Sequence, residues 1–178
     1  PLRDERGEIA GLVVADRDLT DRLEVEAERD EQRRMLRALL GTTPDIVIFK
    51  DRDSRYKAVS ERYRQLIAPN APMKEMLGKT DFDFYAPEVA QRFRDEELHV
   101  MESGKTLKVE HLLHTVEGPR WFEAVKMPLR DEAGNMVGVF TSERDITDRL
   151  KAEAERDEQR RMLKAVLDTL PDFIIFKD

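Results

Sequence analysis

Three histidines are the side chains of this sequence best suited to hold a metal ion: His99, His111 and His114. His111 and His114 fall in one stretch of strand-like sequence. Because an odd number of positions separates them, their side chains point to opposite faces of a strand and do not share one ion. We therefore expect no metal site, and we expect the histidines to be surface or structural residues.

Cysteine is absent, and this removes several kinds of chemistry. Without it the chain forms no disulfide, no thiolate metal site, no c-type haem attachment and no cysteinyl flavin adduct. The segment Asp51–Arg55 begins like a calcium loop, but Arg55 stands where an oxygen ligand is needed, so a hairpin turn is predicted instead. The sequence also has no phosphate-binding glycine loop and no nucleophile elbow. We expect this segment not to be an enzyme.

Charged residues make up 39% of the 178 residues, and they are of both signs. Lys and Arg number 31 against 38 Asp and Glu, for a net charge of -7. A mildly acidic chain lacks the basic stripe that nucleic-acid binding requires. No apolar run approaches the roughly 18 residues that span a bilayer. We expect a cytoplasmic protein segment that contacts neither nucleic acid nor membrane.

A long internal repeat gives the layout of the chain. Residues 1–51 recur as residues 128–178 without a gap, and most paired positions are identical. The stretch Glu26–Leu36 returns unchanged as Glu153–Leu163. A period of this size is that of a whole domain plus its linker, far longer than a solenoid repeat. We therefore predict one complete unit between two partial neighbours.

The predicted units follow from these boundaries. Residues 1–18 are a terminal strand remnant of a preceding unit, and residues 171–178 are a first-strand remnant of a following one. The linker helices cover residues 19–43 and 146–170, and the complete domain covers residues 44–145. Within that domain the pattern predicts two strands, several short helices, three strands and an exit helix, an order typical of an α+β fold with an antiparallel sheet.

This order and a set of local motifs resemble the PAS family of sensor domains with its C-terminal PAC motif. The resemblance covers residues 42–147. It implies a five-stranded antiparallel sheet with short helices on one face, enclosing a small pocket. The matching motifs are Pro44-Asp45, Gly78-Lys79-Thr80-Asp81-Phe82-Asp83, Glu102-Ser103-Gly104-Lys105, Arg120-Trp121-Phe122, Pro128-Leu129-Arg130-Asp131 and Arg144-Asp145-Ile146-Thr147.

The resemblance also implies a function. Such domains sense a ligand, or merely dimerise, and pass the result along the exit helix to an output domain. The expected context is a multi-PAS signalling protein whose output is a histidine kinase or a cyclic-dinucleotide enzyme. A ligand-free structural spacer is the alternative. His99 lies later along its helix than the haem ligand of some relatives, so we expect no haem, and the cofactor is left unassigned.

Two groups of site residues are expected. A pocket for a small molecule would be formed by Tyr56, His111, Trp121 and Lys126. Signal junctions between strand and helix are expected at both copies of one motif, because Asp145 is placed to cap the helix that follows and Ile146 to pack on the core. The junction residues are Asp18, Leu19, Thr20, Asp145, Ile146 and Thr147.

The linker helices are expected to form a homodimer as a parallel coiled coil of marginal stability. Val25, Gln32 and Leu39 follow a heptad spacing, and Ala152, Gln159 and Val166 repeat it in the second copy. A polar residue at such a position lowers stability and leaves more than one register accessible. The alternative is a solvated spacer helix held by weak ion pairs along its surface.

Overall fold

A hairpin of two strands begins the domain. The computed structural model describes residues 2–3, 5–11 and 20–169, and in it β3 spans Ile46–Asp51 and β4 spans Tyr56–Val59. The Asp51 carboxylate accepts hydrogen bonds from the backbone N–H groups of Asp53 and Arg55, at 3.0 and 2.9 Å. The segment that begins like a calcium loop is thus a turn closed by its own aspartate.

Short helices follow the hairpin. These are α2 (Glu61–Ile67), α3 (Met73–Met76), the 3₁₀ turn η1 (Asp81–Asp83) and the longer α4 (Pro87–Ser103). Pro87 occupies the first turn of α4, where a missing N–H costs nothing. Gly104 ends α4 in the left-handed conformation at φ 65°, which glycine adopts without strain.

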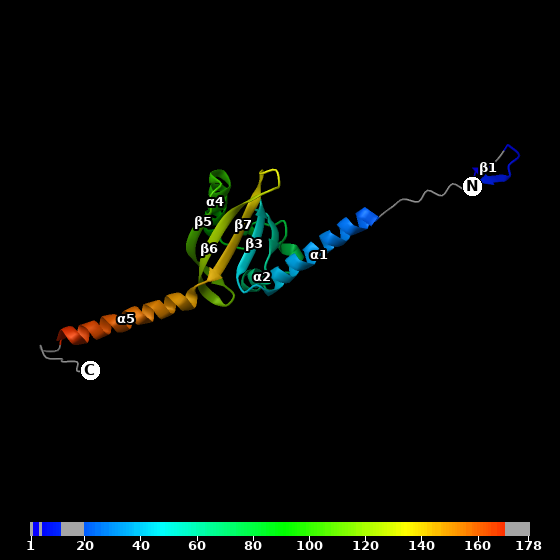
Figure 1. Ribbon diagram of the computed structural model, residues 1–178. Coiled ribbons are helices and arrows are strands. Elements are labelled where there is room, and N and C mark those ends of the chain that lie inside the picture. The colour runs from blue at the N-terminus through cyan, green and yellow to red at the C-terminus, as the bar shows by residue number, and fades with distance from the viewer. Residues whose placement is uncertain (1, 4, 12–19, 170–178) are drawn as a thin grey trace. The chain divides into compact units, whose positions relative to one another are not determined.

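Three long strands complete the sheet. They are β5 (Leu107–Thr115), β6 (Gly118–Arg130) and β7 (Met136–Asp145). The order across the sheet is β4-β3-β7-β6-β5, and every neighbouring pair is antiparallel. Figure 1 shows α2 and α4 on one side of this sheet. The predicted α+β fold with a five-stranded antiparallel sheet and flanking helices is confirmed.

The core lies between the sheet and these helices. Alternate residues of each strand face inward, as the pleat requires. In β3, for example, Ile46, Ile48 and Lys50 are buried while the residues between them are partly exposed. The apolar core contains Ile46, Ile48, Tyr56, Val59, Tyr63, Leu66, Met76, Phe93, Leu113 and Phe122.

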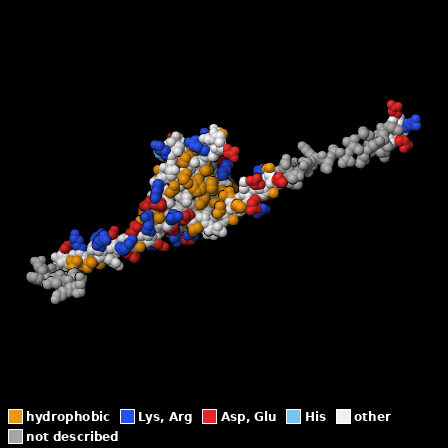
Figure 2. Space-filling view, viewed as in Figure 1, with side chains coloured by type: hydrophobic (Ala, Val, Ile, Leu, Met, Phe, Trp, Pro, Cys, Tyr) orange, Lys and Arg blue, Asp and Glu red, His pale blue; other side chains and the backbone are white. Residues whose placement is uncertain are grey.

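The outward face of the sheet is also rich in apolar side chains. Figure 2 shows them gathered over β3, β7 and β6. Phe49 and Phe140 are cross-strand partners whose ring centroids lie 5.0 Å apart, and Met127 lies opposite Phe140 on the other side. Trp121 and Leu112 form a further outward pair, each about two fifths exposed.

Two helices flank the domain, α1 (Thr20–Thr42) and α5 (Thr147–Thr169). Eight large apolar side chains along these helices are exposed, namely Val25, Met35, Leu36, Leu39, Met162, Leu163, Val166 and Leu167. These are surfaces without a partner among the residues that the structure describes. The remnant expected at residues 171–178 lies outside that part of the chain.

A small hairpin lies near the N-terminus, formed by β1 (Leu2–Arg3) and β2 (Ile9–Gly11). Its pairs are Leu2 with Gly11 and Arg3 with Ile9. Shifted by the repeat period, these are the pairs of the β6–β7 hairpin, where Leu129 faces Gly138 and Arg130 faces Met136. The repeated sequence therefore folds the same way locally, including the register shift.

Candidate functional site

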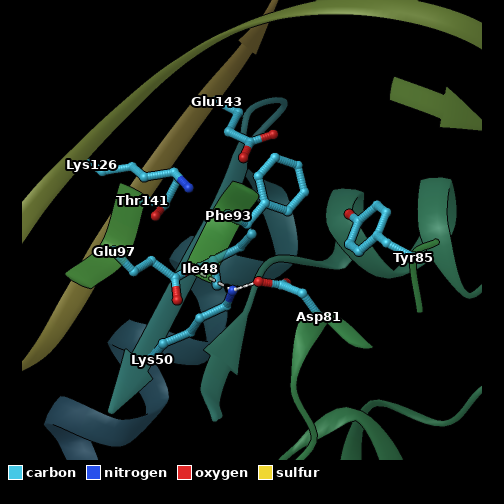
Figure 3. A pocket seen from close by; sticks show the side chains of 9 residues that line it. All are labelled: Ile48, Lys50, Asp81, Tyr85, Phe93, Glu97, Lys126, Thr141 and Glu143. Carbon is cyan, nitrogen blue, oxygen red and sulfur yellow. Dashed lines mark hydrogen bonds and ion pairs between the residues drawn. The ribbon is translucent and has the colours of Figure 1, made fainter. Parts of the chain in front are cut away.

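A buried lysine stands at the centre of the domain. The ammonium of Lys50, on β3, forms ion pairs with Asp81 of η1 and, at 2.6 Å, with Glu97 of α4. All three side chains are at most 5% exposed. Figure 3 shows Lys50 reaching between the two carboxylates. Since a buried charge is costly unless paired, this triad ties two helical elements to the sheet.

Two hydroxyl groups donate hydrogen bonds to the carboxylates of this triad. The phenol of Tyr56 donates to Asp81, and the hydroxyl of Ser54 donates to Glu97. Burial alone would lower the pKa of Lys50, but the charges of Asp81 and Glu97 outweigh it, so that pKa lies above the ordinary lysine value. Burial, followed by the Asp81 charge, raises the pKa of Tyr56 well above its ordinary value. The lysine is held charged and the phenol neutral.

A second group of buried polar side chains lies beside the triad. Lys126 of β6 forms an ion pair with Glu96 of α4 at 2.8 Å. His111 of β5 faces Glu143 of β7, with 3.5 Å between Nε2 and Oε2, too far for a hydrogen bond. Among the described residues, neither ring nitrogen of His111 nor Oε2 of Glu143 has a hydrogen-bond partner, although both side chains are buried.

A small cavity lies among these charged groups. Its volume is about 10 Å³, which is room for one water molecule. Figure 3 shows the side chains around it, with Phe93 next to Glu143 and Tyr85 on the far side of Asp81. The residues that line it are Ile48, Lys50, Asp81, Tyr85, Phe93, Glu97, Lys126, Thr141 and Glu143.

Three of the four residues expected to form a pocket lie in this interior. Lys126 lines the cavity, while Tyr56 and His111 contact residues that line it. Trp121 does not join them: it lies on the opposite face of β6, 41% exposed beside Leu112. Strand alternation explains this, because an odd separation from Lys126 places the two side chains on opposite faces.

The histidines are distributed as their spacing predicts. His111 is buried and His114 is exposed, on opposite faces of β5. Within residues 2–3, 5–11 and 20–169, no group of three His, Cys, Asp or Glu side chains is arranged to hold a metal ion. No helix in that part of the chain is long and apolar enough to cross a bilayer.

The junction between β7 and α5 is built from three adjacent residues. Asp145 accepts a hydrogen bond from the N–H of Thr147 at 2.9 Å, which caps the start of α5. Ile146 is 5% exposed and its N–H donates to the carbonyl of Trp121. The hydroxyl of Thr147 accepts a hydrogen bond from the N–H of Trp121 at 2.9 Å. The first turn of the exit helix is thereby attached to β6 as well as to β7.

Ion pairs connect this junction to the β5–β6 turn and to α2. Arg120 of β6 binds Asp145 at 2.7 Å and Glu117 at 2.8 Å, and Arg62 of α2 binds Glu117 at 2.8 Å. Burial alone would raise the pKa of Asp145, but hydrogen bonds from Thr147 and Arg120 outweigh it, so that pKa lies below its ordinary value. Asp145 is thus held ionised as a cap.

The equivalent junction in the first copy is described only in part. Asp18 and Leu19 lie outside the described residues, and so does the side chain of Thr20. The backbone of Thr20 begins α1, as the backbone of Thr147 begins α5.

Most of the charged interior was missed from the sequence, although a signal for it exists. Lys50 lies two residues after Ile48 and four after Ile46, so it faces the core on the same side of β3 as they do. Glu143 likewise shares the inward face of β7 with Thr141 and Val139. Glu97 falls at helical spacing between Phe93 and Val100, both buried in α4. No spacing points to Asp81, because its position depends on an irregular segment.

Comparison with known proteins identifies the same fold. The family model described as "PAS fold" matches residues 40–151. A methanogenesis regulatory histidine kinase, FilI of Methanothrix harundinacea, is 35% identical over 89% of this chain. The aerobic respiration control sensor ArcB of Escherichia coli is 26% identical over 67% of it. The chain spans 18% of the length of FilI and 15% of that of ArcB, so it corresponds to one segment of each protein.

Solved structures agree. VqmA of Vibrio cholerae, in a complex with ligand and DNA, matches with a TM-score of 0.57 and 26% identity, over 62% of this chain and 50% of that one. The PAS domain of Bordetella pertussis BvgS shares the fold, with a TM-score of 0.54 and 18% identity, over 75% of this chain and 98% of that one. With the family model covering more than half of its length, the chain belongs to the PAS fold family.

Proposed function

We propose that this segment is a sensory and signal-relay module of a larger signalling protein. The observation that carries the proposal lies on β7. This strand bears Glu143, which lines the interior cavity and whose Oε2 has no hydrogen-bond partner among the described residues. Two residues later the strand becomes the junction that holds the exit helix. A change at the cavity therefore reaches α5 through two residues of extended backbone.

The relay depends on the way that the junction is bonded. Three contacts hold α5 to the sheet. Asp145 caps the helix, the side chain of Ile146 is buried, and the hydroxyl of Thr147 accepts a hydrogen bond from β6. A helix that is attached only by flexible backbone would not follow a movement of the sheet. A helix held at three points moves with it, and a bias of about 1–3 kcal/mol is typical of coupling between sites.

The larger protein is proposed to be a histidine kinase with several PAS units. Two of the relatives that match are named as a kinase and a sensor, FilI and ArcB. The hairpin of β1 and β2 repeats the register of the β6–β7 hairpin, as expected if a preceding unit ends in the same way. Residues 1–18 and 171–178 are accordingly proposed to belong to neighbouring units.

A ligand-free spacer is the second candidate, and the size of the cavity favours it. Room for one water molecule suits a filled core that dimerises and transmits strain. Native mass spectrometry of the purified chain, together with thermal melting against small metabolites, separates the two. A retained or stabilising small molecule supports sensing, and a chain that neither retains nor responds to any supports the spacer.

Mutation of the junction tests the relay. Replacing Thr147 by valine leaves the N–H of Trp121 without its acceptor in a partly buried site, and we expect a loss of about 1–2 kcal/mol in the free energy of unfolding. In the full-length parent, the same change should uncouple stimulus from output. Chemical denaturation of the chain and an output assay of the parent measure the two effects.

The matched control is Thr169→Val at the far end of α5, where the hydroxyl bonds only to carbonyls of its own helix. We expect it to leave stability and output unchanged. Thr147→Ser, which keeps the hydroxyl, should retain most of both. A parent protein that still responds with Thr147→Val would refute the relay through this junction.

Dimerisation through the linker helices is the remaining part of the proposal. Gln32 and Gln159 occupy the polar positions of the two heptad patterns, between exposed apolar neighbours. Replacing both by leucine should tighten the dimer at least tenfold, because a buried leucine contributes about 1.5–3 kcal/mol. Sedimentation equilibrium measures this. Gln91→Leu, at an exposed site on α4, is the control, and a chain that stays monomeric with both substitutions would exclude the coiled coil.

A further inference from the structure

Large apolar side chains gather toward the end of each linker helix. In α1 they lie at residues 35–40, where Met35, Leu36 and Leu39 are 44–67% exposed. In α5 they recur at residues 162–167, with four large apolar side chains 43–61% exposed. We call residues 35–40 and 162–167 the apolar segments. The repeat thus places one apolar segment at the equivalent position of each linker helix.

The part of each helix before the apolar segment is charged, and ion pairs form within it. Between residues 24 and 34, α1 has one large apolar residue, Val25, and Ala152 takes its place in α5. Arg34 binds Glu31 at 2.6 Å, and the equivalent pair of α5 lies at 3.0 Å. All four of these side chains are more than half exposed. Ion pairs along one helix need no second chain.

A parallel pair of identical helices brings each central residue against its own copy. Because Val25, Gln32 and Leu39 follow the heptad spacing, another layer of the pair falls between each two of them. The layer after Val25 holds Glu28 in one register and Arg29 in the other, and both place like charges opposite each other, which opposes pairing. The layer after Gln32 holds one of the first two residues of the apolar segment, and it favours pairing in either register.

We propose that the linker helices of two chains pair only through the apolar segments, and that the charged parts before them stay apart. The proposal rests on the dimer proposed above and gives the extent of its interface. The partner is a second copy of this chain, because a segment that recurs with the repeat meets its equivalent in a chain of the same period, held in register. Such an interface is isologous and closes at two chains.

The unpaired part of α5 then serves as a lever between the domain and the apolar segment. It begins at Thr147, which is bonded to β6, and it ends at residue 161. This stretch is about 22 Å long at 1.5 Å per residue. Its single large apolar residue is Leu150, which is partly buried. A tilt of α5 at the junction therefore moves this stretch without breaking a contact between the two chains.

Charges introduced into the two parts of the helix test the proposal. Leu39→Glu combined with Val166→Glu alters both apolar segments, and we expect the dissociation constant of the whole-chain dimer to rise roughly a hundredfold or more. Val25→Glu combined with Ala152→Glu places the same charges at the same heptad position of the charged parts, and should change that constant less than about threefold. All four sites are exposed, so the domain should stay folded, which circular dichroism checks. Sedimentation equilibrium measures the constants.

Spin labels report the same difference as distances between the two chains. The chain has no cysteine, so Arg37→Cys and Ala27→Cys each give one label per chain, at exposed sites that face away from the partner in both registers. Double electron–electron resonance should give a narrow interchain distribution for Arg37→Cys and a broad one for Ala27→Cys. Raising sodium chloride from about 50 to about 500 mM should narrow the second, because salt screens the repulsion between like charges.

Three results would overturn the proposal. In the first, both double variants weaken the dimer equally; in the second, Leu39→Glu with Val166→Glu leaves the dimer intact. Either result leaves a dimer standing, but with a different interface. In the third, the wild-type chain stays monomeric, and the dimer proposed above fails as well. The relay through Thr147 is measured separately, by the output of the parent protein, and none of these results decides it.

Discussion

Replacing Lys50 by methionine is expected to lower the free energy of unfolding by about 3–5 kcal/mol, since two carboxylates would remain buried without their cation. Methionine keeps the length and most of the volume of the side chain, so the loss reports charge rather than packing. Asp81 and Glu97 would lose their ion pairs, and η1 and α4 would lose their attachment to β3. Urea denaturation followed by circular dichroism measures the change.

Exposed charge provides the control for this experiment. Lys57 pairs with Asp51 at 3.0 Å on the surface, with 62% of its side chain exposed, and Lys57→Met should cost less than about 1 kcal/mol. Neutralising the carboxylates too, by adding Asp81→Asn and Glu97→Gln to Lys50→Met, should recover much of the loss. If Lys50→Met costs no more than Lys57→Met, the triad does not hold the domain together.

The pH dependence of the same triad has a definite sign. The pKa of Lys50 is raised in the folded chain above the ordinary lysine value of 10.5, because the charges of Asp81 and Glu97 outweigh burial. Its stabilising contribution is therefore complete below the pKa of an unfolded lysine and is lost as the pH rises through the folded value. The stability difference between wild type and Lys50→Met should accordingly persist through neutral pH and shrink above pH 10.5.

Replacing Gly138 by alanine is expected to cost about 3 kcal/mol or more, the upper range for an inserted methyl group in a packed site. Gly138 lies opposite Asp51 in the β3–β7 ladder, at φ 157°. A Cβ atom there would lie 1.9 Å from the carbonyl oxygen of Lys50, which is backbone and has little freedom to move. The strand that carries the junction would separate from β3, next to the lysine of the triad.

A second glycine isolates the effect of this close contact. Gly134, in the β6–β7 turn, has φ 84° and no atom within 4 Å of an added Cβ. Gly134→Ala therefore reports conformational strain alone, about 1–2 kcal/mol. Thermal unfolding of both variants gives the comparison. A cost for Gly138→Ala equal to or below that for Gly134→Ala would show that the two strands separate easily.

The sheet was predictable because its strands obey a simple alternation. Ile46 and Ile48 indicate a strand with one buried face, and hairpin-sized breaks separate the last three strands. The start of α2 was also readable, since Ser60 precedes it and accepts from the N–H of Tyr63. Those features are local, and local chemistry determines them.

The charged interior was harder to predict because it depends on contacts between distant segments. Lys50 and Glu97 are far apart in sequence, and a lysine at the end of a strand is more often a surface residue. Asp81 lies in a motif that the family resemblance singles out, but nothing near it in the sequence reveals that Lys50 is its partner. Trp121 was expected in the pocket because it is aromatic. Its odd separation from Lys126 along β6 is the better guide, and it places Trp121 on the opposite face of the sheet.

The central claim, that the interior communicates with the exit helix, can be tested by one distance measurement. The chain has no cysteine, so Ala133→Cys in the β6–β7 turn and Arg160→Cys on α5 give two unique spin-label sites, both exposed. Double electron–electron resonance on chains diluted with unlabelled protein reports the distance between them. We predict that Glu143→Gln shifts this distance by about 2 Å, the scale of helix movements in switching proteins, and that Thr147→Val abolishes the shift. A distance distribution that Glu143→Gln leaves unchanged, or that shifts equally when Thr147→Val is present, would contradict the account.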